Sequence, residues 1–210
     1  MKAHERWWQE NLPTRGEEFA GWLRDSDRSS REAVADVAHA IWSGDVRDRV
    51  RVLECGPGIY IDAETIWDHL AYVDYWAIDV TPRIVDLGRS KGYQAVEGSI
   101  ESIPYLIDTF DLVYCRHVLE HLPHYRQALV EMCNVAAKRA VAVLWRLDTE
   151  ATEDRILYNT VAEVPNTFHN MYSQQAITAF LHSMGIEHEW QRCQTDWLLV
   201  MTPGPKRLIL

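Results

Sequence analysis

The sequence predicts an α/β protein built on a mostly parallel, doubly wound sheet. From residue 50 onward, short apolar runs alternate with stretches of helical periodicity, which is typical of strands joined by helices that cover both faces of a sheet. The end of the chain breaks this alternation, because the runs 187–193 and 196–201 flank Gln194-Thr195 at the spacing of a hairpin. We therefore expect one antiparallel strand at the end of the sheet.

The individual elements follow from composition and periodicity. Runs such as F110-D-L-V-Y-C115 and A140-V-A-V-L-W145 suit strands that are buried on both faces. Near the end of the chain, Ser173 is the expected cap of a helix that stops at Gly185. The remaining expectations are strands at 50–55, 74–79, 93–98, 110–115 and 139–146, and helices at 60–71, 82–91 and 123–136.

Residues 1–47 differ from the rest and are predicted to form an N-terminal helical cap. S29-S-R-E32 is a capping box, followed by apolar residues at helical spacing up to Ile41. Upstream, Trp7 and Trp8 begin an aromatic-rich segment that either packs in a core or lines a pocket. Residues 48–210 then form the main domain, and the long stretch at about 148–172 is expected to be a lid or pocket wall inserted into it.

Composition limits the classes of partner and the cell compartment. A chain of 210 residues with 47% hydrophobic residues suits one soluble globular domain. The net charge of -10 disfavours a broad nucleic-acid or anionic-membrane surface. The four cysteines form no C-x-x-C pair, and no secretory signal or run of roughly 20 apolar residues is present. We expect a cytoplasmic protein with reduced thiols that makes no use of a membrane.

The stretch R51-V-L-E-C-G-P-G-I-Y60 indicates a ligand site. A strand that ends in a glycine turn and leads into a helix presents backbone N–H groups at the carboxyl edge of the sheet, where ligands of open α/β sheets bind. Asp79 ends the next strand, at a distance suited to ribose hydroxyls. Together they indicate an adenosine-containing cofactor. Nicotinamide cofactors are disfavoured, because Ile61 stands where their G-x-G-x-x-G fingerprint has its third glycine.

Four segments in register identify a family resemblance. E54-C-G-P-G58, W76-A-I-D-V80, G98-S-I-E-S-I-P104 and F110-D-L-V-Y-C-R-H-V-L-E-H-L122 occur in the order and at the spacing of class I S-adenosylmethionine-dependent methyltransferases. The chain most resembles their small type 11 branch, over roughly residues 48–200. The resemblance implies a Rossmann-like three-layer sandwich with a seven-stranded sheet, S-adenosylmethionine as cofactor and S-adenosylhomocysteine as product.

The resemblance also implies roles for particular positions. The methionine part of the cofactor would lie against the backbone of Gly56 and Gly58, with Glu54 near its amino group and sulfonium. The remaining cofactor contacts would be Asp79 on the ribose, Val80, Ser99 and Ile100 around the adenine, and Arg116 with His117 beside the methyl group.

Two positions depart from the family pattern. Tyr60 stands where the family often has a third glycine, so its ring is expected to tighten or partly fill the turn. Ser99 stands where the family usually has Asp, which removes an acceptor for the adenine amino group. These departures keep open a non-catalytic member of the fold that acts through a protein partner.

The remaining site hypotheses concern catalysis. His117 and His169 are candidates for a general base, because the pKa of histidine lies near neutrality, and Tyr172 is a candidate for an orienting phenol. H117-V-L-E-H121 also matches a zinc peptidase pattern, but a strand ends just before it and Pro123 follows it, so no metal site is predicted.

The predicted reaction is transfer of a methyl group to oxygen or nitrogen of a small organic acceptor. No N-P-P-Y phrase follows the fourth strand, and this absence, with the acidic charge, disfavours methylation of nucleic-acid bases. Methylation of a macromolecule and the non-catalytic partner protein remain as alternatives. The oligomeric state is not indicated by the sequence.

Overall fold

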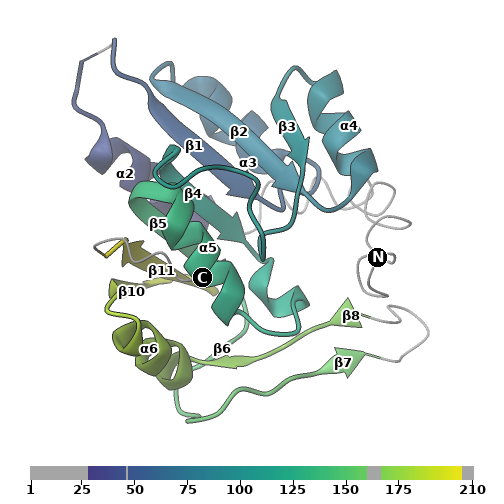
Figure 1. Ribbon diagram of the computed structural model, residues 1–210, viewed down its shortest axis with the longest axis vertical. Helices are drawn as coiled ribbons and strands as arrows, with labels where there is room; N and C mark the ends of the chain where they lie inside the picture. Colours follow the sequence, from purple (N-terminus) through teal and green to yellow (C-terminus); the bar gives the residue numbers. More distant parts are fainter. Residues whose placement is uncertain (1–27, 46, 160–166, 205–210) are drawn as a thin grey trace.

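The computed structural model describes residues 28–45, 47–159 and 167–204. A seven-stranded sheet forms its centre, in the order β10-β11-β5-β4-β1-β2-β3 (Figure 1). All neighbouring strands are parallel except β11, which runs antiparallel to both β5 and β10. The strands are β1 (Val50–Cys55), β2 (Val73–Asp79), β3 (Gln94–Glu97), β4 (Phe110–Arg116), β5 (Ala136–Leu144), β10 (Glu187–Cys193) and β11 (Asp196–Thr202).

Helices cover both faces of the sheet and complete a three-layer sandwich. In Figure 1, α5 lies in front of the sheet, and α2 and α3 lie behind it. Successive residues of β11 point into two separate cores: Leu199 and Met201 belong to the core that includes α5 and α6, whereas Leu198 and Val200 belong to the core that includes α2. The helices are α2 (Arg28–Ile41), α3 (Ile61–Thr65), α4 (Pro82–Ser90), α5 (Arg126–Val135) and α6 (Gln174–Ser183), with short 3-10 helices η1 (Trp67–His69) and η2 (Leu119–His121).

The predicted sheet is confirmed, including the terminal hairpin and the burial of both faces, and the predicted strand bounds agree within a few residues. The expected cap at Ser173 is also present, since its Oγ accepts from the backbone N–H of Ala176. Gly185, just after α6, has the left-handed φ of +68° that suits a helix stop.

Two local predictions are wrong. The helix expected at 60–71 is broken into α3 and η1, because the chain leaves helical geometry at Ile66, where φ is -124°. The capping box at 29–32 does not start a helix, since α2 already begins at Arg28. Ser29, the capping residue of that pattern, lies inside α2, and its Oγ has no hydrogen-bond partner among the described residues. The next residue, Ser30, donates its hydroxyl to Asp196 Oδ2 at 2.6 Å.

The insertion after β5 contains short paired strands. β6 (Leu147–Asp148) pairs with β9 (Tyr172–Ser173), and β7 (Tyr158–Asn159) pairs with β8 (Thr167–Phe168). Helix α2 shares a core with the sheet, whereas the predicted aromatic segment around Trp7 and Trp8 lies outside the described residues. Within the described ranges, no helix is both long and apolar enough to cross a membrane.

Candidate active site

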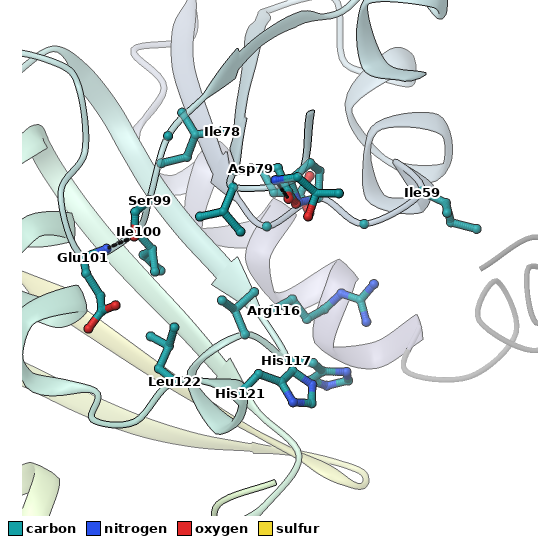
Figure 2. A pocket seen from close by; sticks show the side chains of 18 of the residues that line it. Ile59, Ile78, Asp79, Ser99, Ile100, Glu101, Arg116, His117, His121 and Leu122 are labelled. Carbon is teal, nitrogen blue, oxygen red and sulfur yellow. Dashed lines mark hydrogen bonds between the residues drawn. The ribbon is translucent and has the colours of Figure 1, made fainter. Parts of the chain in front are cut away.

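A cavity of about 320 Å³ lies at the carboxyl edge of the sheet, where β1, β2 and β4 end. Figure 2 shows Asp79, Ser99 and Ile100 in one part of its wall and Arg116, His117 and His121 in another. All of the side chains and glycines that the sequence assigned to the cofactor border this one cavity: Glu54, Gly56, Gly58, Asp79, Val80, Ser99, Ile100 and Arg116.

The glycine turn after β1 brings bare backbone to the cavity. Gly56 has a φ of +75° and donates its N–H to the carbonyl of Ile78 at 2.8 Å. A Cβ on Gly56 would stand 2.6 Å from Val118 Cγ2, so only glycine fits there. Gly58, with a φ of +56°, has no atom within 4 Å of where a Cβ would be. The first glycine therefore allows close packing, and the second leaves space for a ligand.

Tyr60 does not fill the turn. Its backbone is left-handed, with a φ of +67°, which is the conformation that a third glycine would adopt easily. Its side chain is fully buried and packs in the core with α4, facing Gly88 and stacked on Tyr93 with ring centroids 5.4 Å apart. Because the ring points away from the cavity, the expectation that Tyr60 partly fills the turn is wrong.

Glu54 is a buried acid at the end of β1. It is 2% exposed, and Tyr75 donates its hydroxyl to Oε2 at 2.6 Å. Burial raises the pKa of Glu54 to about 8, and the nearby carboxylate of Asp62 adds to the rise, although hydrogen bonds from Tyr114 and Tyr75 act against it. At neutral pH this carboxyl is mostly protonated, and a cation beside it would favour the carboxylate.

Asp79, at the end of β2, is held in place by the next turn. The backbone N–H of Thr81 donates to Oδ1 at 2.8 Å. Burial raises the pKa of Asp79 to about 6, with the Thr81 hydrogen bonds acting in the opposite direction. The side chain is therefore mostly ionised at neutral pH and offers a carboxylate to hydroxyl groups in the cavity.

Arg116 enters the cavity wall as part of a buried ion-pair network. Its Nη2 lies 2.7 Å from Oδ1 of Asp62, and its Nε lies 2.9 Å from Oδ2. Arg31, in α2, approaches the same carboxylate with Nε at 3.0 Å. Two guanidinium groups thus share one carboxylate at this corner of the cavity.

Two histidines follow β4. His117 has a left-handed φ of +57°, its backbone N–H donates to Val143 at 3.0 Å, and Nε2 lies 3.2 Å from Asp196 Oδ2. The Nδ1–H of His121 donates to the carbonyl of Phe168 at 2.8 Å. Burial lowers the pKa of His121 to about 4, so this imidazole is neutral at physiological pH.

Part of the sequence of this site matches a known family model. Residues 53–144 match the model described as "Methyltransferase domain", in the type 11 branch, and the match spans the glycine turn and the ends of β1, β2 and β4. The predicted resemblance to this family is confirmed, and the matched domain supports an S-adenosylmethionine-dependent methyltransferase.

One curated relative, YcgJ, resembles this chain in sequence and in fold. The uncharacterized methyltransferase YcgJ of Bacillus subtilis is 29% identical over 130 residues, which are 58% of this chain and 49% of YcgJ. Its crystal structure aligns with a TM-score of 0.58 at 19% identity, covering 78% of this chain and 70% of that one. The chain thus spans about half the length of the curated relative that it matches.

Two further solved structures share the fold. A chain from the complex of the Haloferax volcanii Trm112 methyltransferase activator with a methyltransferase aligns with a TM-score of 0.65 at 12% identity, over 91% of this chain and 98% of that one. The Burkholderia thailandensis 1,6-didemethyltoxoflavin-N1-methyltransferase, solved with its substrate and S-adenosylhomocysteine, aligns with a TM-score of 0.61 at 14% identity, over 90% of each chain.

The predicted catalytic residues do not all lie together. His117 borders the cavity. His169 lies outside its lining, with its ring centroid 5.0 Å from that of His121. Tyr172 is fully buried, and its hydroxyl lies 3.0 Å and 2.9 Å from the carbonyls of Leu119 and Leu122. An orienting role for Tyr172 therefore does not fit its position, because its hydroxyl is used inside the core.

Sequence reasoning missed several residues of the cavity wall. His121 was considered only as part of a zinc pattern, although its spacing from His117 was visible in H117-V-L-E-H121. In the described part of the chain, no three His, Cys, Asp or Glu side chains gather as a metal site would need. The other unassigned lining residues are Pro57, Ile59, Ile61, Ile78, Thr81, Gly98, Glu101, Val118 and Leu122.

Proposed function

We propose that the chain binds S-adenosylmethionine in this cavity and transfers its methyl group to oxygen or nitrogen of a small organic acceptor. One observation carries the proposal: eight residues assigned to the cofactor from separate sequence motifs border a single cavity at the carboxyl edge of the sheet. The match to the methyltransferase family model supports it, as does the S-adenosylhomocysteine bound in the Burkholderia thailandensis structure.

The charges of the cavity suit this cofactor. In the proposal, Glu54 accepts the ammonium group of the methionine part, a cation that would compensate for burial of the carboxylate. Asp79 accepts the ribose hydroxyls, and Val80 and Ile100 flank the adenine. Ser99 lacks the usual carboxylate, but Glu101 stands two residues later and borders the same cavity, so it is the proposed acceptor for the adenine amino group.

The other end of the cavity is proposed to receive the acceptor. The bound cofactor supplies a methyl group activated by a positively charged sulfur. The protein must align the acceptor and exclude water, and alignment alone can contribute on the order of 7–11 kcal/mol. Val118 and Leu122 provide apolar walls, the neutral His121 provides a polar group without charge, and His117 borders the same cavity. This wall suits a small aromatic or aliphatic acceptor better than a highly charged one.

The domain division is part of the proposal, with residues 1–47 as a cap and 48–210 as the methyltransferase domain. One alternative is a non-catalytic protein that acts through a protein partner, and the Haloferax volcanii chain, which was solved with an activator, supports it. Tyr60 does not favour this alternative, because its ring leaves the glycine turn open for the cofactor.

Calorimetric titration with S-adenosylhomocysteine tests the proposal, with NAD as the control ligand. We expect micromolar binding of S-adenosylhomocysteine alone. Asp79→Ala removes at least one hydrogen bond to a charged acceptor, worth about 1.5–3 kcal/mol, so the affinity should fall by at least about 10- to 150-fold. Glu97→Ala is the matched control, since Glu97 ends the neighbouring strand β3 outside the cavity. Absence of binding to the wild-type chain would refute the proposed function.

A further inference from the structure

Three segments far apart in the sequence meet behind His117. Asp196 is the first residue of β11, directly after the Gln194-Thr195 turn of the terminal hairpin, and it is 1% exposed. Its Oδ2 accepts the hydroxyl of Ser30 in α2 at 2.6 Å and lies 3.2 Å from Nε2 of His117. The acid therefore stands on the side of the imidazole that faces the terminal hairpin.

The two nitrogens of His117 have different surroundings. Nε2 is fully buried and lies 3.2 Å from Oδ2 of Asp196, the carboxylate oxygen that it faces. Nδ1 makes no hydrogen bond to any described residue and is not among the buried atoms, while the side chain as a whole is 21% exposed and borders the cavity. Only Nδ1 is therefore placed to meet a ligand.

Asp196 is ionised at neutral pH. Burial raises the pKa of its carboxyl, but the contacts with His117 and Ser30 outweigh burial and hold the pKa below its usual value. A carboxylate can only accept hydrogen bonds, so the nitrogen that faces it must carry a proton. The partner of one imidazole nitrogen thus decides the protonation of the other.

The backbone supports the same orientation. The left-handed φ of His117 is uncommon for a residue with a side chain, and such conformations occur where the surrounding structure holds them, often at functional sites. Its N–H donates to Val143 in β5, which fixes the residue at the end of β4. The main chain and the side chain of His117 are therefore both held by contacts on the side away from the cavity, the N–H by Val143 and Nε2 by Asp196.

We propose that Asp196 is a positioning residue for His117: its carboxylate keeps the proton on Nε2 and leaves the lone pair of Nδ1 directed to the cavity, where it takes the proton of the methyl acceptor. The proposal rests on the proposed methyl transfer. The O–H or N–H proton of the acceptor passes to Nδ1, the acceptor lone pair forms the new bond to the methyl carbon, and sulfur retains the electron pair of the bond that breaks. The positive charge thereby moves from sulfur to the imidazolium.

The test is a ¹H–¹⁵N spectrum of the full chain labelled with ¹⁵N-histidine, at a pH where histidine is ordinarily neutral, with His117 assigned from its loss in His117→Gln. We expect the wild type to hold the Nε2–H tautomer. In Asp196→Asn the amide can donate as well as accept, so the ratio of Nε2–H to Nδ1–H should fall by about fivefold or more, which corresponds to one ordinary hydrogen bond. Asp111→Asn, at the opposite end of β4, should leave the ratio unchanged.

The wild-type spectrum alone can overturn the proposal, which matters if Asp196→Asn does not fold: an Nδ1–H tautomer would show that Nδ1 has no lone pair for the acceptor. An unchanged ratio in folded Asp196→Asn would reduce Asp196 to a structural contact of α2. Titration of the same samples with S-adenosylhomocysteine separates the proposed function from the role of Asp196. Absence of binding to the wild type refutes the proposed function, whichever tautomer His117 has. If the wild type binds, the spectrum alone decides the role of Asp196.

Discussion

Gly88 in α4 gives a direct test of how the glycine turn is supported. A Cβ at this position would lie 2.8 Å from Cε1 of Tyr60 and closer still to Cζ and Oη, all inside the 3.0 Å that real Cβ atoms respect. The Tyr60 ring is fully buried and stacked on Tyr93, so it has no open space to enter. Gly88→Ala should therefore displace the ring that anchors the turn.

The sign of the expected stability change follows from one stabilising and two destabilising effects. Alanine in place of glycine inside a helix stabilises by about 1 kcal/mol. Overpacking a core destabilises by about 1–3 kcal/mol, and disturbing the aromatic pair by about 0.5–1.5 kcal/mol. The net effect is a loss of roughly 2 kcal/mol in the free energy of unfolding, or about 4–8 °C in Tm for a chain of this size.

Urea unfolding of a double-mutant cycle measures the effect. In a Tyr60→Gly background the clash is absent and the left-handed φ is easily adopted, so Gly88→Ala should there stabilise by about 1 kcal/mol. The coupling between the two changes would then be about 3 kcal/mol, the sum of the two opposite effects. If Gly88→Ala stabilises the wild type, or acts equally in both backgrounds, the packing of Tyr60 on α4 is misjudged.

Two further predictions concern buried acids. Asp62→Asn leaves Arg31 and Arg116 without their shared carboxylate, and urea unfolding should show a loss of about 3–5 kcal/mol; a loss below 1 kcal/mol would mean that the pairs are solvated. The pKa of Glu54 is about 8 in the folded protein against 4.5 in the unfolded chain. The contribution of this group to the free energy of unfolding is therefore fully present below about pH 4.5 and is lost as the pH rises to about 8. Melting curves of the ligand-free protein should thus show Glu54→Gln gaining stability relative to the wild type over this range, and parallel curves would contradict the buried acid.

The sheet could be predicted because its signals are local. A run such as A140-V-A-V-L-W145 is apolar on both faces, and in the structure alternate residues of β5 pack into the two cores. The glycine turn and Asp79 could be placed in one site for the same reason, since parallel strands bring their carboxyl ends to one edge. The strands could thus be predicted from hydrophobic periodicity, and the shared site of the glycine turn and Asp79 from sheet topology.

The failures have a different origin. The capping-box pattern at 29–32 predicts the start of a helix, but α2 already includes Arg28, and Ser30 inside it donates its hydroxyl to Asp196, 166 positions away. Tyr172 was assigned to the pocket, but its hydroxyl satisfies carbonyls next to η2. In both cases a polar side chain found a partner distant in sequence, and no local pattern predicts which partner a fold will bring to it. Tyr60 failed likewise, because a left-handed residue other than glycine depends on its surroundings.

The same distant contacts connect the cavity to parts of the chain outside the family match at 53–144. Arg116 and His117 are adjacent, and each is held by a buried acid, Asp62 or Asp196. Those acids are held in turn by Arg31 and Ser30, adjacent residues of α2. Because burying charge costs free energy unless each group is paired, this chain of contacts tolerates few alternative positions of α2. Helix α2 and the terminal hairpin therefore fix the two side chains that border the cavity where β4 ends.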